Sequence, residues 1–133
     1  MSRHEARDAA FKLVFEIPFH GCNYKDRIEF FIENLEVELS EADKKYVKKA
    51  VEVCFENLAI IDEKINPLLK KWTLARIPKV SLSVLRLAVA EMCYFDDIPY
   101  QVSINEAVEL AKQYGDDDAP AFVDGVLDKI AKQ

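Results

Sequence analysis

The most apolar window of the chain reads VSLSVLRLAVAEMCYF, from Val80 to Phe95. It contains Arg86 and Glu91 and is about 16 residues long, so it is too charged and too short for a bilayer, which takes about 20 apolar residues. Its apolar side chains occupy nearly all sides of the helix that it would form, and other protein segments surround such a helix. We therefore expect Val80 to Phe95 to be the central helix of the fold.

The composition around this helix predicts an all-α protein. The chain has 133 residues, enough for one compact domain with a real core, and it is 50% hydrophobic and 32% charged, which excludes wholesale disorder. It contains only three Gly and five Pro, too few turn-forming residues for a many-stranded β architecture.

The first helix is expected from Arg3 to Ile17. Ser2 and Glu5 form a capping box at its start, and Pro18 is expected to end it. A helical wheel places one apolar stripe on it, which consists of Ala6, Ala9, Ala10, Leu13 and Ile17.

Two further segments precede the central helix. One is a helix from about Tyr24 to Leu35, and the other is a long helical segment capped by Ser40. Apolar residues recur in the long segment at spacings of four and three: Val47, Val51, Cys54, Leu58, Ile61, Ile65 and Leu68. We expect an intramolecular bundle rather than a coiled coil, with Asp62 capping a new start and a bend near Pro67.

Two helices are expected after the central one. Ser103 and Glu106 form a second capping box for a helix that ends at Gly115, and Asp118 is expected to cap the last helix, with Pro120 in its first turn. The last helix should bury Val123, Val126, Leu127 and Ile130. The whole chain, 1–133, is thus expected to be one domain of about seven helices in two packed halves, 1–71 and 79–133, divided near Trp72.

The sequence offers no pattern typical of catalytic, metal or cofactor chemistry. It has no glycine-rich phosphate loop, and His4 and His20 lack the spacing of a zinc site. Cys22, Cys54 and Cys93 are widely spaced, which favours buried thiols in a reducing compartment. The first residues are charged, unlike a signal peptide. We therefore expect a cytoplasmic protein that is not an enzyme, has no cofactor and does not enter a membrane.

The net charge of −6 argues against nucleic acid as a partner, but phosphates respond to local patches. Arg3, His4 and Arg7 would lie on one exposed flank of the first helix with Phe11 beside them, which offers phosphate donors next to a stacking surface. On residue chemistry alone, a solvated helix whose arginines pair with its own Glu5 or Asp8 explains this flank better.

The segment from Asp116 to Lys129 is a second candidate. An acidic start suits the helix dipole, but Phe122 falls at the edge of the buried stripe, where a ring is available for a base. Gly125 inside the helix costs about 1 kcal/mol relative to Ala, which indicates a close approach by either a packed helix or a ligand.

Four blocks of the sequence resemble the NusB family. APAFVDGVLDKIA, from Ala119 to Ala131, is similar to the family's C-terminal signature, which usually reads Phe-Val/Ile-Asn-Gly-Val/Ile-Leu. IPYQVSINEAVELAK, from Ile98 to Lys112, resembles its other strong block. VLRLAVAEM, from Val84 to Met92, is similar to its central helix, and Arg3 to Ala10 follows its arginine-rich start in a weaker form. The resemblance covers nearly the whole chain in order.

This resemblance implies two helical subdomains and a role in transcription antitermination. The family binds the boxA element of nascent ribosomal transcripts, as a heterodimer with the small-subunit ribosomal protein that doubles as NusE, and helps RNA polymerase to pass terminators. By the same resemblance, Arg3, His4 and Arg7 match the RNA-binding helix, and Asp118 and Phe122 match the adjoining RNA-facing edge. Whether the free protein is a monomer or a homodimer is left open.

The chain departs from the family pattern at two positions. His4 stands where many relatives have arginine, so phosphate affinity should be lower and should rise as the pH falls. Asp124 replaces the signature Asn, which removes an amide donor and adds a negative charge at a position that we include in the RNA-binding site. If that amide contacts RNA in relatives, this chain should bind more weakly.

Two other classes of protein compete with this interpretation. One is a purely protein-binding helical adaptor without RNA affinity of its own, which the acidic charge favours. The other is the NusB-like domain of an RNA cytosine methyltransferase, but the 133 residues include no nucleotide-binding domain.

Overall fold

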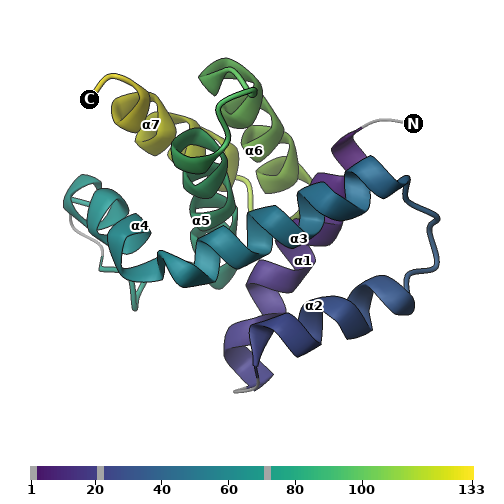
Figure 1. The fold of residues 1–133 in the computed structure, drawn as a ribbon. Helices are drawn as coiled ribbons and strands as arrows, with labels where there is room; N and C mark the ends of the chain where they lie inside the picture. The colour runs from purple at the N-terminus through teal and green to yellow at the C-terminus, as the bar shows by residue number, and fades with distance from the viewer. Residues whose placement is uncertain (1–2, 21–22, 71–72) are drawn as a thin grey trace.

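A computed structural model describes residues 3–20, 23–70 and 73–133 of the chain (Figure 1). These residues form seven α-helices, one short 3-10 helix and no strand, which confirms the all-α class. The helices are α1 (Arg3–His20), α2 (Tyr24–Glu33), α3 (Glu41–Glu56), α4 (Leu58–Ile65), α5 (Lys79–Tyr94), α6 (Tyr100–Tyr114) and α7 (Ala119–Ala131), and the 3-10 helix is η1 (Asn66–Leu68). Within the described ranges, no helix is long and apolar enough to cross a membrane.

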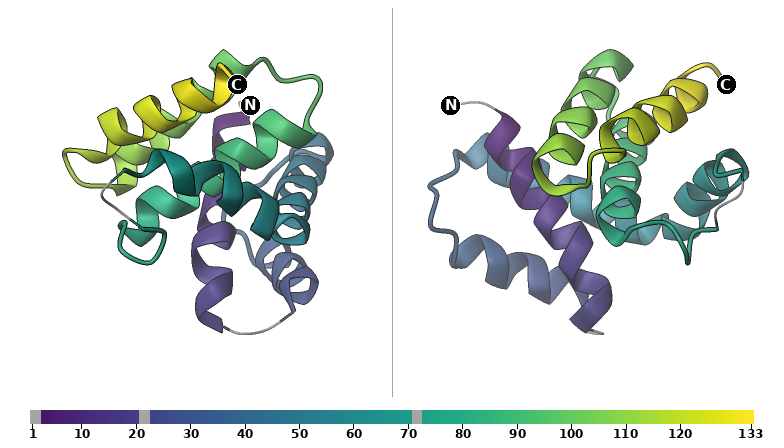
Figure 2. Two further views of the ribbon diagram at one scale, coloured as in Figure 1. Left: turned by 90° about the vertical axis from the view of Figure 1, so that its left-hand side faces the viewer. Right: turned by 180° about the vertical axis from the view of Figure 1, so that it is seen from behind.

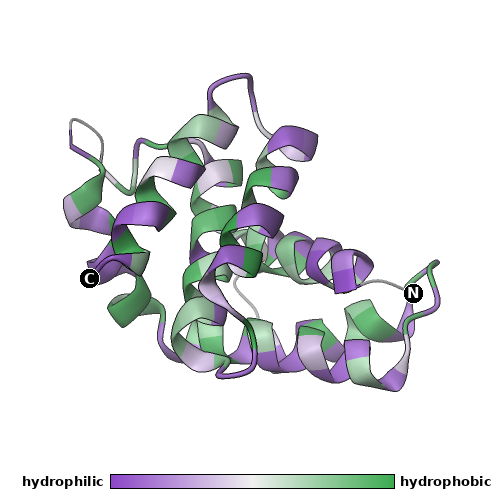
Figure 3. Cartoon of the chain, turned by 90° about the horizontal axis from the view of Figure 1, so that it is seen from above, coloured by the Kyte–Doolittle hydropathy of each residue, from purple (hydrophilic) through white to green (hydrophobic). Residues whose placement is uncertain are grey.

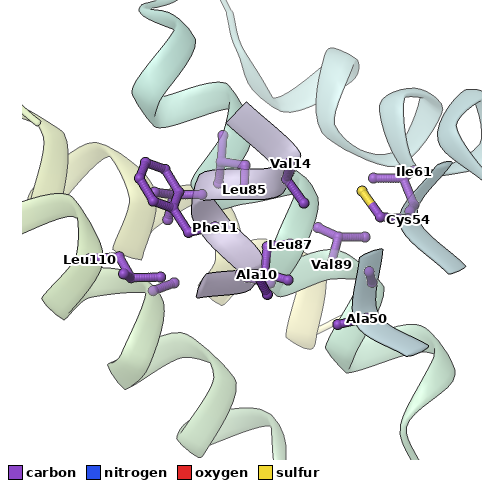
Figure 4. Packing of buried hydrophobic residues seen from close by; sticks show 14 of the residues in the cluster. Ala10, Phe11, Val14, Ala50, Cys54, Ile61, Leu85, Leu87, Val89 and Leu110 are labelled. Carbon is purple, nitrogen blue, oxygen red and sulfur yellow. The ribbon is translucent and has the colours of Figure 1, made fainter. Parts of the chain in front are cut away.

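Helix α5 is the centre of the fold, as its sequence predicts. It packs against α1, α3, α4, α6 and α7, and every residue from Ser81 to Met92 is buried except Arg86. In Figure 4, Leu85, Leu87 and Val89 of this helix face side chains from α1, α3 and α6 across one interior. Hydrophobic residues therefore concentrate inside the bundle, and hydrophilic ones cover its outer faces (Figure 3).

The other helices form two groups on either side of α5 (Figures 1 and 2). Helices α1, α2 and α3 pack on one another, whereas α6 and α7 form a pair, and both groups share a single hydrophobic cluster. Trp72, where we expect the two halves to divide, lies outside the described residues, so that division stays a prediction.

Helix α1 is longer than expected, because Pro18 lies inside it and the helix ends only at His20. A proline removes one backbone hydrogen bond, here in the last turn, where the loss disturbs few neighbours. The expectation of an end at Ile17 is therefore wrong, while the predicted stripe of Ala6, Ala9, Ala10, Leu13 and Ile17 is buried. Ser2, the first half of the predicted capping box, lies outside the described residues.

Helix α2 ends at Glu33, two residues before the expected end, and buries Ile28 fully. The predicted cap Ser40 is confirmed, since its Oγ accepts a hydrogen bond of 3.1 Å from the Asp43 amide. The long segment that follows breaks at Asn57, whose side-chain amide donates to the Val53 carbonyl at 2.9 Å. This local bond competes with helix continuation.

The restart that we predict at Asp62 is therefore wrong, since α4 begins at Leu58 and Asp62 instead binds Arg86 of α5 at 2.9 Å. At Asn66, next to Pro67, α4 gives way to the 3-10 helix η1, and the bend that we expect near Pro67 stays a prediction.

The boundaries of α6 and α7 are partly as predicted. Helix α6 begins at Tyr100 after Pro99, so Ser103 is one turn inside the helix and the capping box with Glu106 is wrong. Gly115 ends the helix as predicted, and it must lack a side chain because a Cβ there would lie 2.6 Å from the Cβ of Ala119. Asp118 occupies the N-cap position of α7, but its carboxylate makes no capping bond.

In α7, Pro120 lies in the first turn as predicted. The predicted stripe of Val123, Val126, Leu127 and Ile130 is buried.

Candidate nucleic-acid interface

Arg3 and His4 lie at the exposed start of α1, as predicted, and their side chains are 37% and 46% exposed. Arg3 Nε donates to Asp43 Oδ1 of α3 at 2.9 Å, and its guanidinium lies 4.7 Å from the centre of the Tyr46 ring. His4 Nδ1 lies 3.2 Å from Glu106 Oε1 of α6. Both side chains thus contact carboxylates from distant helices rather than from their own. We call Arg3 and His4 the exposed rim.

Arg7 is buried, so the expectation that it shares the exposed flank with Arg3 is wrong. Its Nε and Nη2 donate to the two carboxylate oxygens of Glu91 at 2.9 and 3.1 Å. Phe11 is buried as well and stacks on Tyr114 with the ring centres 4.9 Å apart, so it offers no surface to a base. The helix turns both residues toward α5 and α6, which cover them.

Glu91 accepts hydrogen bonds from three helices besides its own. Arg7 of α1 donates twice, Tyr46 of α3 donates through its hydroxyl, and Ser103 of α6 donates through Oγ at 3.0 Å. No buried side-chain polar atom of the described residues lacks a partner. We call Arg7, Tyr46, Glu91 and Ser103 the polar junction, since they tie α1, α3, α5 and α6 together.

Burial and charge shift the pKa values of the polar junction. Burial raises the pKa of the Tyr46 hydroxyl well above its usual value, and the negative charge of Glu91 raises it further. Burial alone would lower the pKa of the Arg7 guanidinium, but its hydrogen bonds to Glu91 and the charge of that carboxylate raise it. Arg7 therefore stays charged, and Tyr46 stays a neutral donor at any physiological pH.

Asp124 lies on the exposed side of α7, at a groove between α6 and α7. The groove is lined by Asn105, Glu106, Val108, Glu109, Lys112, Pro120, Ala121 and Asp124. Glu106 is also the carboxylate that contacts His4, so this groove adjoins the exposed rim. The adjacent Gly125 has no described atom within 4 Å of the position that a Cβ would take, so a packed helix does not explain it.

Asp118 and Phe122 lie in a different hollow, against the start of α5. It is lined by Ile77, Pro78, Ser81, Asp116, Asp118, Ala119 and Phe122. Phe122 is half-buried, as the sequence predicts, and Asp118 is exposed. In the described part of the chain, no hydrogen bond or ion pair joins this hollow to Arg3 or His4. The structure thus places the predicted residues in four locations: the exposed rim, the polar junction that holds Arg7, the groove and the hollow.

The remaining titratable clusters point to no metal chemistry. No three metal-ligating side chains of residues 3–20, 23–70 and 73–133 come together in a way that could hold an ion. Cys54 is buried as predicted, and burial raises the pKa of its thiol to about 12. Cys93 is exposed, so the expectation of a buried thiol is wrong for it, and Cys22 lies outside the described residues.

Comparison with known proteins decides the family. The model of the NusB family matches residues 4–132. The chain belongs to the NusB family. It is 42% identical to the transcription antitermination protein NusB of Natranaerobius thermophilus, over 100% of this chain and 96% of that protein. It is 40% identical to NusB of Acetivibrio thermocellus, over 99% of this chain and 90% of the relative.

Solved NusB structures share the fold over the full length. The structure of T. maritima NusB superposes with a TM-score of 0.90 at 36% identity and covers 100% of this chain and 92% of that one. A chain of the crystal structure of antitermination factors NusB and NusE in complex with dsRNA superposes with a TM-score of 0.85 at 29% identity, over 99% of this chain and 98% of that chain.

Sequence reasoning did not identify Glu91 as the residue whose carboxylate connects four helices of this chain. It treated Glu91 only as a charge that argues against a membrane span, although a carboxylate inside an otherwise apolar helix must find buried donors. The sequence alone therefore indicates that Glu91 needs buried donors. It does not indicate which residues donate, because the donors come from three other helices: Arg7, Tyr46 and Ser103.

Proposed function

We propose that this protein is a transcription antitermination factor that binds boxA-type RNA of nascent ribosomal transcripts. It acts together with the small-subunit ribosomal protein that serves as NusE, in the antitermination complex of RNA polymerase. Full-length similarity to a NusB chain in a complex with NusE and dsRNA carries the proposal, with 99% of this chain and 98% of that chain covered. The role is one of binding, without catalysis, and it is carried out in the cytoplasm.

The exposed rim supplies the phosphate contacts. Arg3 uses only Nε in the hydrogen bonds of the described residues, so its two terminal nitrogens remain available to a phosphate. A guanidinium suits this task because it presents several donors in one plane. His4 would add a second donor beside Arg3, since its side chain is 46% exposed.

Phe122 and Asp118 supply the contacts to bases. The half-buried ring of Phe122 lies in a hollow at the start of α7, where one of its faces can stack on an unpaired base. Asp118 beside it can accept hydrogen bonds from base amino groups, because it makes no capping bond within α7.

We assign Arg7 an indirect role in place of the direct contact expected from sequence. Its side chain is 6% exposed and holds Glu91 through two hydrogen bonds. It therefore fixes the start of α1, and hence Arg3 and His4, rather than touching phosphate itself. Asp124 would weaken binding, since it adds a carboxylate to a groove that already contains Glu106 and Glu109.

The proposal is tested by fluorescence anisotropy with a labelled boxA RNA, with and without the NusE protein. We expect weak binding by the free protein and tighter binding with the partner, because the chain carries a net charge of −6 and only a small cationic rim. Arg3→Ala should weaken binding, whereas Lys132→Ala, which changes an exposed pair on α7, should not. Equal affinity with and without NusE contradicts the proposal. Binding of NusE without any binding of RNA would favour the protein-binding adaptor.

A further inference from the structure

Helix α3 carries four lysines on its outer face, the half-buried Lys44 and the exposed Lys45, Lys48 and Lys49. Lys44 is 3.5 Å from Glu41, one turn earlier. In the part of the chain that the structure describes, no carboxylate oxygen lies within 4.0 Å of the ammonium groups of Lys45, Lys48 and Lys49. Other described lysines, such as Lys25 and Lys129, also lack an acidic partner, so the distinctive feature of α3 is that four lysines gather on one helix face of an acidic chain.

Lys49 adjoins the exposed rim through two aromatic rings. The guanidinium of Arg3 lies 4.7 Å from the centre of the Tyr46 ring. That ring lies 5.5 Å from the Phe95 ring, and Lys49 Nζ lies 4.2 Å above Phe95. The two cations thus sit on neighbouring rings at the junction of α1, α3 and the end of α5. Figure 1 shows α3 on the outside of the bundle, crossing α1.

The position of Lys45 extends this arrangement along α3. Lys45 and Lys49 are one helical turn apart and lie on one ridge of the helix, about 6 Å apart along the axis. Lys44 and Lys48 form the neighbouring ridge. On the helical wheel, the ridge of Lys45 and Lys49 is the one nearer to Tyr46, and hence to Arg3.

Covering Phe95 explains only part of this arrangement. A lysine stem can shield an apolar ring, and its ammonium gains from the ring's electrons. This accounts for Lys49, but it does not account for Lys45, which contacts no ring among the described aromatic contacts. Acidic residues lie near this ridge in the sequence, but in the described part of the chain Glu52, Asp96 and Asp97 form no ion pair with it.

We propose that Lys45 and Lys49 continue the RNA-binding surface from Arg3 across α3 and bind the phosphate backbone of the RNA. This inference rests on the proposed function and deepens it. Ammonium groups act as point charges and contact phosphates without reading bases. The two lysines therefore hold the strand next to the rim in a way that does not depend on its sequence, and base recognition remains with Phe122 and Asp118.

The test compares two double variants that remove the same charge from neighbouring ridges of one helix. Lys45→Gln/Lys49→Gln should weaken the binding of boxA RNA to the complex with NusE roughly three- to tenfold at low salt, and it should lower the salt slope by about two units. Lys44→Gln/Lys48→Gln should stay within about twofold of the wild type, because Lys44 is already paired with Glu41 and neither lysine lies on the rings that adjoin Arg3. Equal losses in both variants would mean a general charge effect and overturn the proposal.

Two further measurements separate the charge from other roles. Lys49→Met keeps an apolar stem over Phe95 without the charge, so it should reduce RNA affinity while the melting temperature stays near that of the wild type; Lys49→Arg should restore binding. An RNA of scrambled sequence should lose affinity by the same factor in Lys45→Gln/Lys49→Gln. A loss confined to boxA would show base recognition by these lysines and overturn the backbone assignment.

The outcomes also distinguish this inference from the proposed function. If the wild type binds no RNA with or without NusE, the proposed function itself fails. If the wild type binds RNA and Lys45→Gln/Lys49→Gln binds it equally well, only the inference fails. If that variant loses affinity for NusE in the absence of RNA, the ridge contacts the protein partner and the inference is wrong.

Discussion

Arg3 and Arg7 are one turn apart on α1, yet their environments are opposite. The side chain of Arg3 is 37% exposed on the rim, and that of Arg7 is 6% exposed in the polar junction. Each binds a carboxylate at 2.9 Å, from α3 and α5 respectively. The comparison shows that helical spacing defines which residues share a flank, but the helices packed against that flank decide which of them can reach a ligand.

The two environments also change how much an arginine–carboxylate ion pair contributes to the stability of the fold. An exposed ion pair contributes little to stability, because water and salt screen it. In a buried pair, removing one partner leaves the other as an uncompensated charge, which costs several kcal/mol. Residues of the polar junction should therefore affect folding, and residues of the rim should affect RNA binding. The following substitutions test this division and the adjoining groove, from the largest expected effect to the smallest.

Glu91→Ala should destabilise the fold by about 3–5 kcal/mol, because it removes the acceptor of three buried donors. Arg7 would keep only the more distant carboxylate of Glu106, 3.7 Å from its Nη1. Urea denaturation measures the free energy of unfolding. The control is Glu109→Ala, which breaks an exposed pair with Lys112 and should cost less than about 1 kcal/mol. Similar losses in the two variants would contradict the contrast between junction and surface.

Tyr46→Phe should cost about 1.5–3 kcal/mol at neutral pH, since it removes the hydroxyl that donates to Glu91. The pKa of Tyr46 is raised by burial first and then by Glu91, so the folded state holds this proton more tightly than the unfolded state does. The stability that depends on the proton is complete below about pH 10, the usual tyrosine value, and is lost as the pH rises from there toward the folded pKa.

The stability difference between the wild type and Tyr46→Phe should therefore narrow above about pH 10, as measured by urea denaturation at several pH values. Tyr100→Phe, at an exposed tyrosine, serves as the control and should show neither the loss nor its pH dependence. A difference that stays constant into strong alkali would mean that Tyr46 has the same pKa in the folded and unfolded states, which contradicts the raised pKa.

Arg3→Ala should weaken RNA binding and lower the salt slope by about one unit. It should cost less stability than Glu91→Ala, because Arg3 is 37% exposed, although its partner Asp43 is only 8% exposed. Arg7→Ala should mainly destabilise the fold, and any loss of RNA affinity should follow from that loss of stability. Salt titrations of RNA affinity, made at a temperature where both variants are folded, measure the first effect. If Arg7→Ala stays as stable as the wild type and loses RNA affinity, Arg7 contacts RNA directly and our assignment is wrong.

Asp124→Asn should tighten RNA binding roughly two- to fivefold at low salt, because it removes a carboxylate that repels phosphate and supplies an amide donor. Its melting temperature should hardly change, since the side chain is exposed. Asp128→Asn, on the same helix and paired with Lys132, is the matched control and should have a smaller effect on binding. Unchanged affinity across the salt range would give Asp124 a structural role only.

Sequence periodicity was sufficient to find most of the fold. The central helix, the stripe of α1 and the stripe of α7 follow from apolar spacing, because burial of one face is a local property of a helix. Two of the wrong helix boundaries lie at residues whose side chain can form either of two hydrogen bonds. Asn57 binds a backbone carbonyl and ends α3, and Ser103 binds Glu91 instead of capping α6. Both residues could serve either purpose by chemistry alone.

The candidate site was less predictable, for a related reason. The exposure of Arg3 follows from its position on α1 alone, and the half-buried state of Phe122 follows from its position on α7 alone. The burial of Arg7 depends on Glu91, and the partners of Arg3 and His4 depend on α3 and α6. The lysine ridge of α3 was visible in the sequence as two pairs of lysines. Its link to Arg3 depends on the contact between the Tyr46 and Phe95 rings, which join distant segments of the chain.

The polar junction also has a consequence for the order of events during protein synthesis. Arg7 leaves the ribosome early, but Glu91 follows 84 residues later, which takes roughly 4–17 s at about 5–20 residues per second. During that time α1 to α4 also lack α5, the helix on which α1, α3 and α4 pack. The nascent first half therefore exposes apolar stripes and an unpaired arginine until the central helix arrives. The first helix to be made is thus fixed in place only after most of the chain has been translated.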